Sequence, residues 1–173
     1  MPRKAIHEIE RLLETEDSAT FQQVDNHIVF TVGERMLASK MIEGQFPAFE
    51  KVIAVTGDKK VVIERERLAT AIRRVSLLSS ERSRAVKLGL SSGKLELAAS
   101  SPDLGEARES LAVDYAGEAL EIAFNAQYLL DFLAVAASDA VVLELKDHES
   151  QGVLRPQAEG GTDHRYVVMP MRL

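Results

Sequence analysis

Cysteine is absent from the 173-residue sequence. Its absence excludes disulfide bonds, thiolate metal sites and a cysteine nucleophile, and it is consistent with a reducing compartment. Long apolar runs are absent as well, since no stretch approaches the roughly 18 to 20 apolar residues that a membrane helix needs. The first four residues, MPRK, do not carry the apolar stretch of a secretion signal. We therefore expect a cytoplasmic protein without membrane contact.

The local motifs on which enzyme assignments rest are also missing. The sequence has no GxSxG elbow, no glycine-rich phosphate loop and no arrangement of paired carboxylates that rises above chance. One enzymatic alternative would use the polar turn at residues 147–150 together with Asp163 and His164. We expect no catalytic residue, no cofactor and no metal ion. The histidines lack metal-ligand spacing; they are His7, His27, His148 and His164.

An excess of positive charge is lacking too. The chain has 21 lysines and arginines against 27 aspartates and glutamates, which gives a net charge of -6. Such a balance is a poor starting point for simple electrostatic binding to nucleic acid. Its 46% hydrophobic and 28% charged residues are ordinary for a folded soluble protein. Any role with nucleic acid must therefore depend on where the cations lie.

One pattern is present three times. Segments with helical apolar spacing begin at Arg3, Arg65 and Asn125, and each precedes a series of short alternating strands at a repeat of roughly 60 residues. The odd number matters. If two such units must pair to close one core, three units make one complete domain and half of another.

The first unit has a helix and a three-stranded meander. We expect the helix at residues 3–14, with Pro2 suited to its first turn. Asp25-Asn26 and Gly33-Glu34 are turn signals of the hairpin type. They separate strands expected at residues 20–24, 27–32 and 35–43.

The second and third units match each other element for element. Each begins with a strand, continues with the helix and ends with three strands, which predicts an α+β fold. We expect a truncated half domain at residues 1–56, a linker at 57–60 and a complete domain at 61–173. The expected strands are 61–64, 85–90, 94–99 and 106–115 in the second unit, and 118–124, 141–146, 152–156 and 164–170 in the third.

Several separated motifs carry a family resemblance. The final eight residues, YVVMPMRL from Tyr166, resemble the C-terminus of the bacterial DNA polymerase III beta subunit, the sliding clamp. The resemblance covers essentially the whole chain and identifies it with the C-terminal half of that family. The other motifs occur in the family's order: Pro2-Arg3-Lys4, Gly44-Gln45-Phe46-Pro47, Leu77-Leu78-Ser79, and Phe124-Asn125 with Tyr128.

The resemblance implies an architecture and a non-enzymatic role. The family's protomer resembles six such units arranged as three similar domains, with helices on one side and antiparallel sheets on the other. Two protomers close a ring around duplex DNA. On this mapping the chain is the second half of the middle domain plus the complete last domain. A clamp tethers the replicative polymerase topologically and confers processivity, so the implied partners are non-specific duplex DNA, the DNA polymerase III catalytic subunit, the clamp loader and repair polymerases.

The resemblance also implies a groove that accepts short linear motifs carrying leucine and an aromatic residue. Flexible methionines suit a pocket that must accommodate many partners. Two positions depart from many relatives, because Gln151 is polar and Ser83 stands where some carry an aromatic residue. The far wall of the pocket belongs to the missing half domain, so we expect this chain to bind partner peptides weakly. The implied groove residues are Pro47, Lys51, Val52, Asn125, Tyr128, Gln151, Val167, Val168, Met169, Pro170, Met171 and Arg172.

Two further surfaces follow from the same resemblance. Arg3, Lys4, Arg73 and Arg74 are implied to face the DNA backbone, where they would position phosphates without reading sequence. Residues 64–74 carry four arginines against two glutamates, which favours this interpretation. Arg108 and Gly105 interrupt the usual acidic run of the ring-dimer edge. The edge residues are Leu77, Leu78, Asp103, Glu106 and Glu109.

A different class of function is also compatible with the residues. The edge strands of a stand-alone peptide-binding module could capture partners without encircling DNA.

Overall fold

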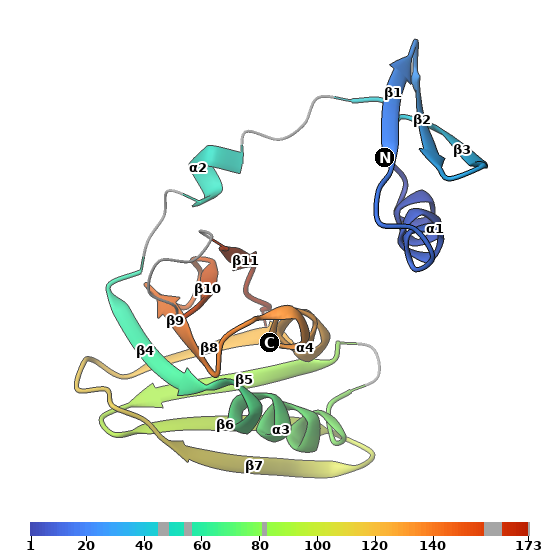
Figure 1. Cartoon of the computed structure of the whole chain (residues 1–173). Coiled ribbons are helices and arrows are strands. Elements are labelled where there is room, and N and C mark those ends of the chain that lie inside the picture. Colours follow the sequence, from blue (N-terminus) through green and yellow to red (C-terminus); the bar gives the residue numbers. More distant parts are fainter. Residues whose placement is uncertain (45–48, 54–56, 81–82, 158–163, 173) are drawn as a thin grey trace. The chain divides into compact units, whose positions relative to one another are not determined.

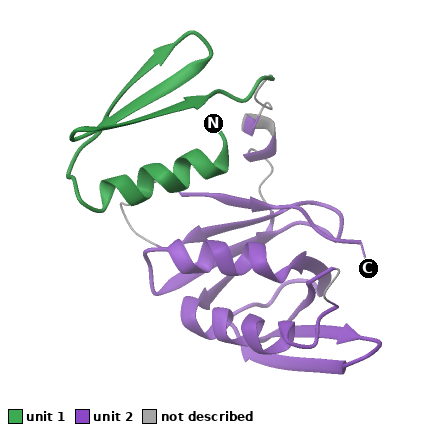
Figure 2. Ribbon diagram, turned by 90° about the vertical axis from the view of Figure 1, so that its right-hand side faces the viewer, with its two compact units in different colours: residues 1–47 green, residues 48–173 purple. Residues whose placement is uncertain are grey.

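The computed structural model describes residues 1–44, 49–53, 57–80, 83–157 and 164–172 (Figure 1). The chain divides into two compact units, residues 1–47 and 48–173, shown in green and purple in Figure 2. Each unit is described by itself below.

Unit 1 is a single helix with a three-stranded antiparallel sheet in the order β1-β2-β3. Asp25 and Gly33 have φ values of 51° and 58° in the two hairpin turns, as the turn signals indicated. The helix and the first two strands confirm the expectation, but β3 ends at Lys40 because β2 begins opposite it at His27. The elements are α1 (Arg3–Leu13), β1 (Thr20–Val24), β2 (His27–Val32) and β3 (Arg35–Lys40).

Unit 2 contains two copies of the strand, helix and three-strand pattern, as the repeat predicted. A five-residue helix that the sequence did not predict, α2 (Phe49–Ile53), precedes them. The first copy is β4 (Lys59–Glu64), α3 (Arg65–Ser76), β5 (Ala85–Ser91), β6 (Lys94–Ser101) and β7 (Gly105–Ala112). The second copy is β8 (Leu120–Asn125), α4 (Ala126–Val135), β9 (Ala140–Leu145), β10 (Gly152–Pro156) and β11 (Tyr166–Val168).

The two copies interlock by exchanging their leading strands. β4 pairs with β9 and β8 pairs with β5, which gives two four-stranded sheets in the orders β11-β10-β9-β4 and β7-β6-β5-β8 (Figure 1). The first residue of each helix also forms a backbone hydrogen bond with the other copy. The amide of Arg65 donates to the carbonyl of Asp139 at 2.8 Å, and that of Ala126 donates to the carbonyl of Arg84 at 2.9 Å.

The core of unit 2 lies between the helices and the sheets. α3 and α4 pack against each other, and the Arg65 guanidinium joins them by donating to the Leu133 carbonyl at 3.2 Å. Both α3 and α4 bury apolar side chains, as their helical spacing of apolar residues predicted. The largest fully buried side chains include Phe124, Phe132, Leu68, Ile72, Leu88, Leu97 and Leu143.

Every strand of unit 2 except β10 differs from the expectation at one or both ends, and β11 is limited to Tyr166–Val168 where residues 164–170 were expected. β4 begins at Lys59, inside the expected linker, because Lys59 and Lys60 pair with Leu145 and Glu144 on β9. β8 begins at Leu120 because the Glu118 carbonyl accepts from the Tyr115 hydroxyl at 2.7 Å, in the preceding turn. β7 ends at Ala112, before that turn.

Among the described residues, no helix is long and apolar enough to span a membrane.

Candidate partner-binding site

The C-terminal segment, residues 166–172, runs from one sheet of unit 2 to the other. β11 is the edge strand of its sheet and pairs with β10 through Tyr166, Val167 and Val168. Pro170 lacks an amide hydrogen, so the expected strand does not continue. Met171 instead donates its amide to the Ala123 carbonyl on β8, an edge strand of the other sheet, at 2.7 Å. Both ends of the segment are therefore anchored by backbone hydrogen bonds.

A hollow of about 640 Å³ lies beside this segment. Its apolar lining comes from Ile122 and Ala123 of β8 and from Met169, Pro170 and Met171. Met169 is 63% exposed, which is high for so apolar a side chain. Four of the twelve expected groove residues line the hollow, since Arg172 does so as well. The fold also brings β5, β8 and the turn at residues 147–150 beside the C-terminal segment, which adds residues that were not expected here: Lys87, Glu121, Ile122, Ala123, His148 and Glu149.

The other described groove residues lie on α2, beside β10, at the start of α4 and on β11 itself. Val52 on α2 is 41% exposed, and its carbonyl accepts from Gln151 Nε2 at 2.8 Å. The polar side chain of Gln151 thus links α2 to the start of β10 by a hydrogen bond. Val167 is half-buried, whereas Val168 is only 3% exposed and packs in the core. Pro47 and the side chain of Lys51 lie outside the described part of the chain.

The two remaining groove residues, Asn125 and Tyr128, lie at the start of α4. Asn125 is its N-cap, and the side chain accepts from the Gln127 amide at 2.9 Å, which satisfies an otherwise free helix donor. Tyr128 is 54% exposed one turn later. Burial, with Asp131 and Tyr128 nearby, raises the pKa of the Tyr166 hydroxyl. Tyr166 also stacks on Phe132, with ring centroids 5.4 Å apart, so β11 packs against α4.

The expected ring-dimer edge coincides with a free sheet edge. β7 is the outermost strand of its sheet, and Leu77, at the end of α3, is 75% exposed. Leu78 is half-buried and Asp103 is exposed. Exposed Leu104, at 59%, adds an apolar side chain that the sequence analysis did not include.

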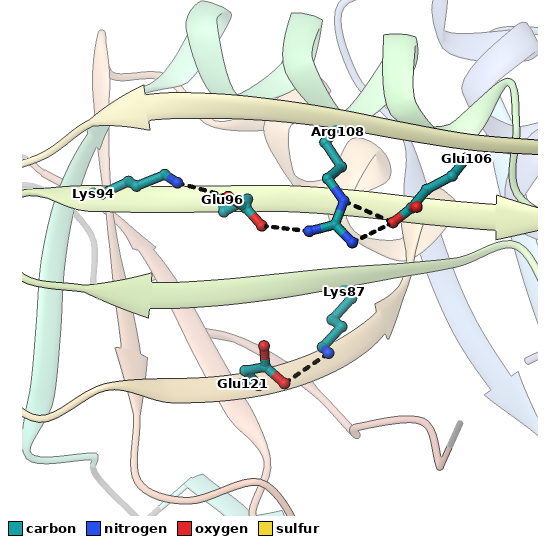
Figure 3. A network of polar contacts seen from close by, with 6 residues as sticks. All are labelled: Lys87, Lys94, Glu96, Glu106, Arg108 and Glu121. Atoms are coloured by element: carbon teal, nitrogen blue, oxygen red, sulfur yellow. Dashed lines mark hydrogen bonds and ion pairs between the residues drawn. The ribbon is translucent and has the colours of Figure 1, made fainter.

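The two glutamates of this edge, Glu106 and Glu109, already have cationic neighbours within the chain. Glu109 lies 3.0 Å from Arg74 on the helix side of β7. On the opposite face, Arg108 lies 2.7 Å from Glu106 and 3.3 Å from Glu96, and the hydrogen bond from Lys94 is the first cause of the lowered Glu96 pKa (Figure 3). Lys87 and Glu121 form a separate pair at 2.6 Å in the same view. The edge is thus less acidic than its glutamates alone suggest.

The four expected DNA-facing cations are all exposed. Arg3 and Lys4 lie in the first turn of α1, whereas Arg73 and Arg74 lie in the last turn of α3. Only Arg74, of these four, takes part in an ion pair within the part of the chain that the structure describes.

The described residues do not assemble the site that the enzymatic alternative would use. Asp147 Oδ1 accepts from the amides of Glu149 and Ser150 at 2.9 and 2.7 Å. These backbone hydrogen bonds hold the Asp147 pKa below its ordinary value, as expected for a carboxylate that closes its own turn. Asp163 lies outside the described residues. His164 packs on Phe132 with centroids 5.4 Å apart.

Comparison with protein families decides the assignment. Residues 50–172 match the model of the C-terminal domain of the DNA polymerase III beta subunit, and residues 1–48 match the model of its central domain. The chain belongs to the DNA polymerase III beta subunit family. The resemblance found in the sequence is therefore confirmed, including its position in the C-terminal half.

Individual relatives agree with this family. The chain is 43% identical over its whole length to the beta sliding clamp of Pseudomonas putida and 35% identical to that of Chlamydia pneumoniae. It covers 47% and 46% of these two proteins, respectively. The chain thus spans about half the length of the beta clamp relatives that it matches.

Solved beta clamp structures share the fold. The DNA polymerase III subunit beta of Pseudomonas aeruginosa superposes with a TM-score of 0.90 at 41% identity, over 99% of this chain and 47% of that one. A sliding clamp from Bartonella birtlesii bound to griselimycin superposes with a TM-score of 0.91 at 36% identity, over 100% and 46%. The expected DNA clamp fold, with repeated helix and sheet units, is confirmed.

Proposed function

We propose that this chain is the C-terminal half of a sliding clamp and serves as its partner-docking part. In the complete ring the clamp would encircle duplex DNA and confer processivity on the replicative polymerase. The observation that carries the proposal is the anchored C-terminal segment, which presents Met169 beside the hollow, within a chain of the beta subunit family. No catalytic step is part of this role, and it would take place in the bacterial cytoplasm.

The docking surface is suited to short linear motifs. Met169, Met171 and Ile122 offer an apolar wall, and thioether side chains adapt to different partners. Exposed Tyr128 and Val52 would extend the surface on neighbouring elements. The partners of this surface would be the polymerase catalytic subunit, the clamp loader and repair polymerases, one at a time.

Ring closure would use the free edge of β7. Exposed Leu77 and Leu104 offer apolar contacts next to unpaired backbone groups, which favours pairing with a strand of another protomer. Because Glu106 and Glu109 already pair with Arg108 and Arg74, apolar contacts would contribute more to this association than long-range charge attraction.

The DNA contribution would be weak and non-specific. Arg73 and Arg74, and separately Arg3 and Lys4, provide exposed cations on helices of a chain with a net charge of -6. Topological linkage requires only that the ring interior does not repel phosphate. Such contacts would position the backbone without reading bases.

Retention on circular DNA tests the proposal against a stand-alone peptide-binding module. The full-length protein that carries this sequence is loaded onto nicked circular plasmid and separated by gel filtration. Retention on closed circles, followed by release on linearisation, is the expected result. Release from closed circles would contradict encirclement, and peptide binding without retention would favour the module.

A further inference from the structure

The short helix α2 needs support from outside its own residues. It spans the five residues Phe49–Ile53, whereas an isolated helix of fewer than about 12 residues is marginal in water. A helix also leaves its last four carbonyls without partners inside the helix. The Val52 carbonyl of α2 belongs to this group. A donor for this carbonyl would therefore stabilise the C-terminal end of α2.

The donor is an amide side chain from a distant part of unit 2. Gln151 Nε2 donates to the Val52 carbonyl at 2.8 Å, and the two residues are 99 positions apart in the sequence. The Gln151 side chain thus acts as a cap for α2, in the way that residues next to a helix satisfy its free end. The position of α2 in unit 2 is therefore coupled to the start of β10.

The backbone of Gln151 is held on both sides. In the preceding turn, Asp147 accepts from the Ser150 amide at 2.7 Å and from the Ser150 hydroxyl at 2.9 Å. The following residue, Gly152, is buried and pairs with Val168 on β11. The Gln151 amide therefore starts from an ordered backbone. The main entropic cost of its bond to α2 is the lost freedom of its own side chain.

The register of β10 and β11 places Gln151 next to the proposed docking surface. Gly152 and Val168 are the last antiparallel pair of these strands, and one step beyond them lie Gln151 and Met169. Met169 is 63% exposed and Val52 is 41% exposed. The Gln151 amide thus connects the helix that carries Val52 to the strand end that precedes Met169.

We propose that Gln151 is a positioning residue for partner docking. It holds the C-terminal end of α2, and with it Val52, beside the end of β11, where Met169 is exposed. Gln151 acts through its bond to Val52 and not through contact with the partner peptide. The inference rests on the proposed function, because it assigns a role within the same docking surface.

The helical population of α2 in the free 173-residue chain tests the bond without any partner. Gln151→Met keeps a side chain of similar length but removes the donor. Carbon-13 chemical shifts should therefore show a lower helical population in α2, with β10 unchanged. Gln151→Lys keeps a donor and should retain more of the helix. An unchanged helical population in Gln151→Met would overturn the proposal.

Fluorescence anisotropy with a peptide that carries leucine and phenylalanine tests the consequence for docking. Gln151→Met should raise the dissociation constant about 3- to 10-fold, as expected for the loss of one hydrogen bond. Gln151→Lys should raise it less. The matched control is Gln127→Met, which removes another exposed 2.8 Å amide bond, from Gln127 to Asp131 within α4. Equal effects of Gln151→Met and Gln127→Met would contradict the proposal.

A double-mutant cycle separates positioning from direct contact. Val52→Ser removes the apolar side chain but leaves the carbonyl that accepts from Gln151. If Gln151 acts through Val52, Gln151→Met should add little to the loss of affinity caused by Val52→Ser. Independent effects that multiply would indicate direct contact of Gln151 with the peptide and would overturn the positioning role.

The unaltered chain distinguishes this inference from the proposed function. Absence of peptide binding by the unaltered chain would contradict both the docking function and the role of Gln151. Binding that Gln151→Met leaves unchanged would contradict the role of Gln151 alone.

Discussion

The Met171 amide donates a 2.7 Å hydrogen bond to the Ala123 carbonyl, and this single contact fixes the C-terminal segment to an edge strand of the opposite sheet. Together with the β10–β11 pairing it holds Met169 between two backbone anchors. A backbone that is already anchored loses little conformational entropy when a partner binds, which makes this position suited to docking.

Replacement of Met169 by serine should reduce binding of a peptide that carries leucine and phenylalanine. Loss of one apolar contact predicts about a tenfold or larger increase in the dissociation constant. Stability should change little, since Met169 is 63% exposed. Fluorescence anisotropy and thermal melts check the two effects. Val135→Ser is the control, because Val135 is 66% exposed on α4 and does not line the hollow.

Addition of a methyl group at Gly152 should destabilise unit 2. A Cβ there would lie 2.7 Å from the Phe124 ring and 3.3 Å from Leu145, both fully buried. Overpacking of this kind predicts a loss of about 1 to 3 kcal/mol for Gly152→Ala in urea unfolding. The control Gly89→Ala meets its nearest neighbour only at 3.8 Å and should unfold as the original chain does. A tolerated Gly152→Ala variant would be inconsistent with this packing.

Glu144 should contribute more to stability than an exposed glutamate in the same unit. Its side chain is 6% exposed and lies 2.8 Å from Arg155 and 3.5 Å from Lys60. Glu144→Ala leaves both cations without this partner and should cost about 1 to 3 kcal/mol. Glu121→Ala removes the exposed pair with Lys87 and should cost less than about 1 kcal/mol. Chemical denaturation of both variants provides the comparison, and equal losses would count against a special role for Glu144.

Alkaline pH should destabilise the fold through Tyr166. Because burial raises its pKa above the ordinary 10.0, the folded state holds this proton more tightly than the unfolded state. The resulting stabilisation is complete below the ordinary value and is lost as the pH rises through the raised one. Urea midpoints measured on both sides of 10.0 should show the loss. Tyr166→Phe should reduce it most, whereas Tyr128→Phe removes only the smallest of the three causes of the raised pKa and should reduce it less.

Much of the fold follows from local sequence patterns. The three helices with periodic apolar residues begin at or next to the expected residues, and Asn125 proves to be the N-cap of the last one. The strand exchange that joins β4 to β9 could not be predicted from periodicity, because it depends on partners about 80 residues apart. The short α2 was missed because five residues give too little periodic signal.

The candidate site was predictable only in part, for the same reason. The resemblance pointed to Met169 and its neighbours, but Ile122 and Ala123 join the hollow through the fold-dependent contact at Met171. The pairing of Arg74 with Glu109 joins residues 35 positions apart on a helix and a strand. The composition gives the number of these charges, but it does not show which charged residues form ion pairs.

Mapping a bound peptide on the chain itself tests the central claim most directly. In a nitrogen-15 NMR titration with the leucine- and phenylalanine-containing peptide, the account predicts that the largest shifts fall on Met169, Met171 and Arg172, with smaller ones at Tyr128 and Val52. Weak affinity would not obscure this pattern. Shifts confined to the outer sheet face around Glu96 and Arg108, or no shifts at saturating peptide, would contradict the assignment of the C-terminal segment as the docking surface.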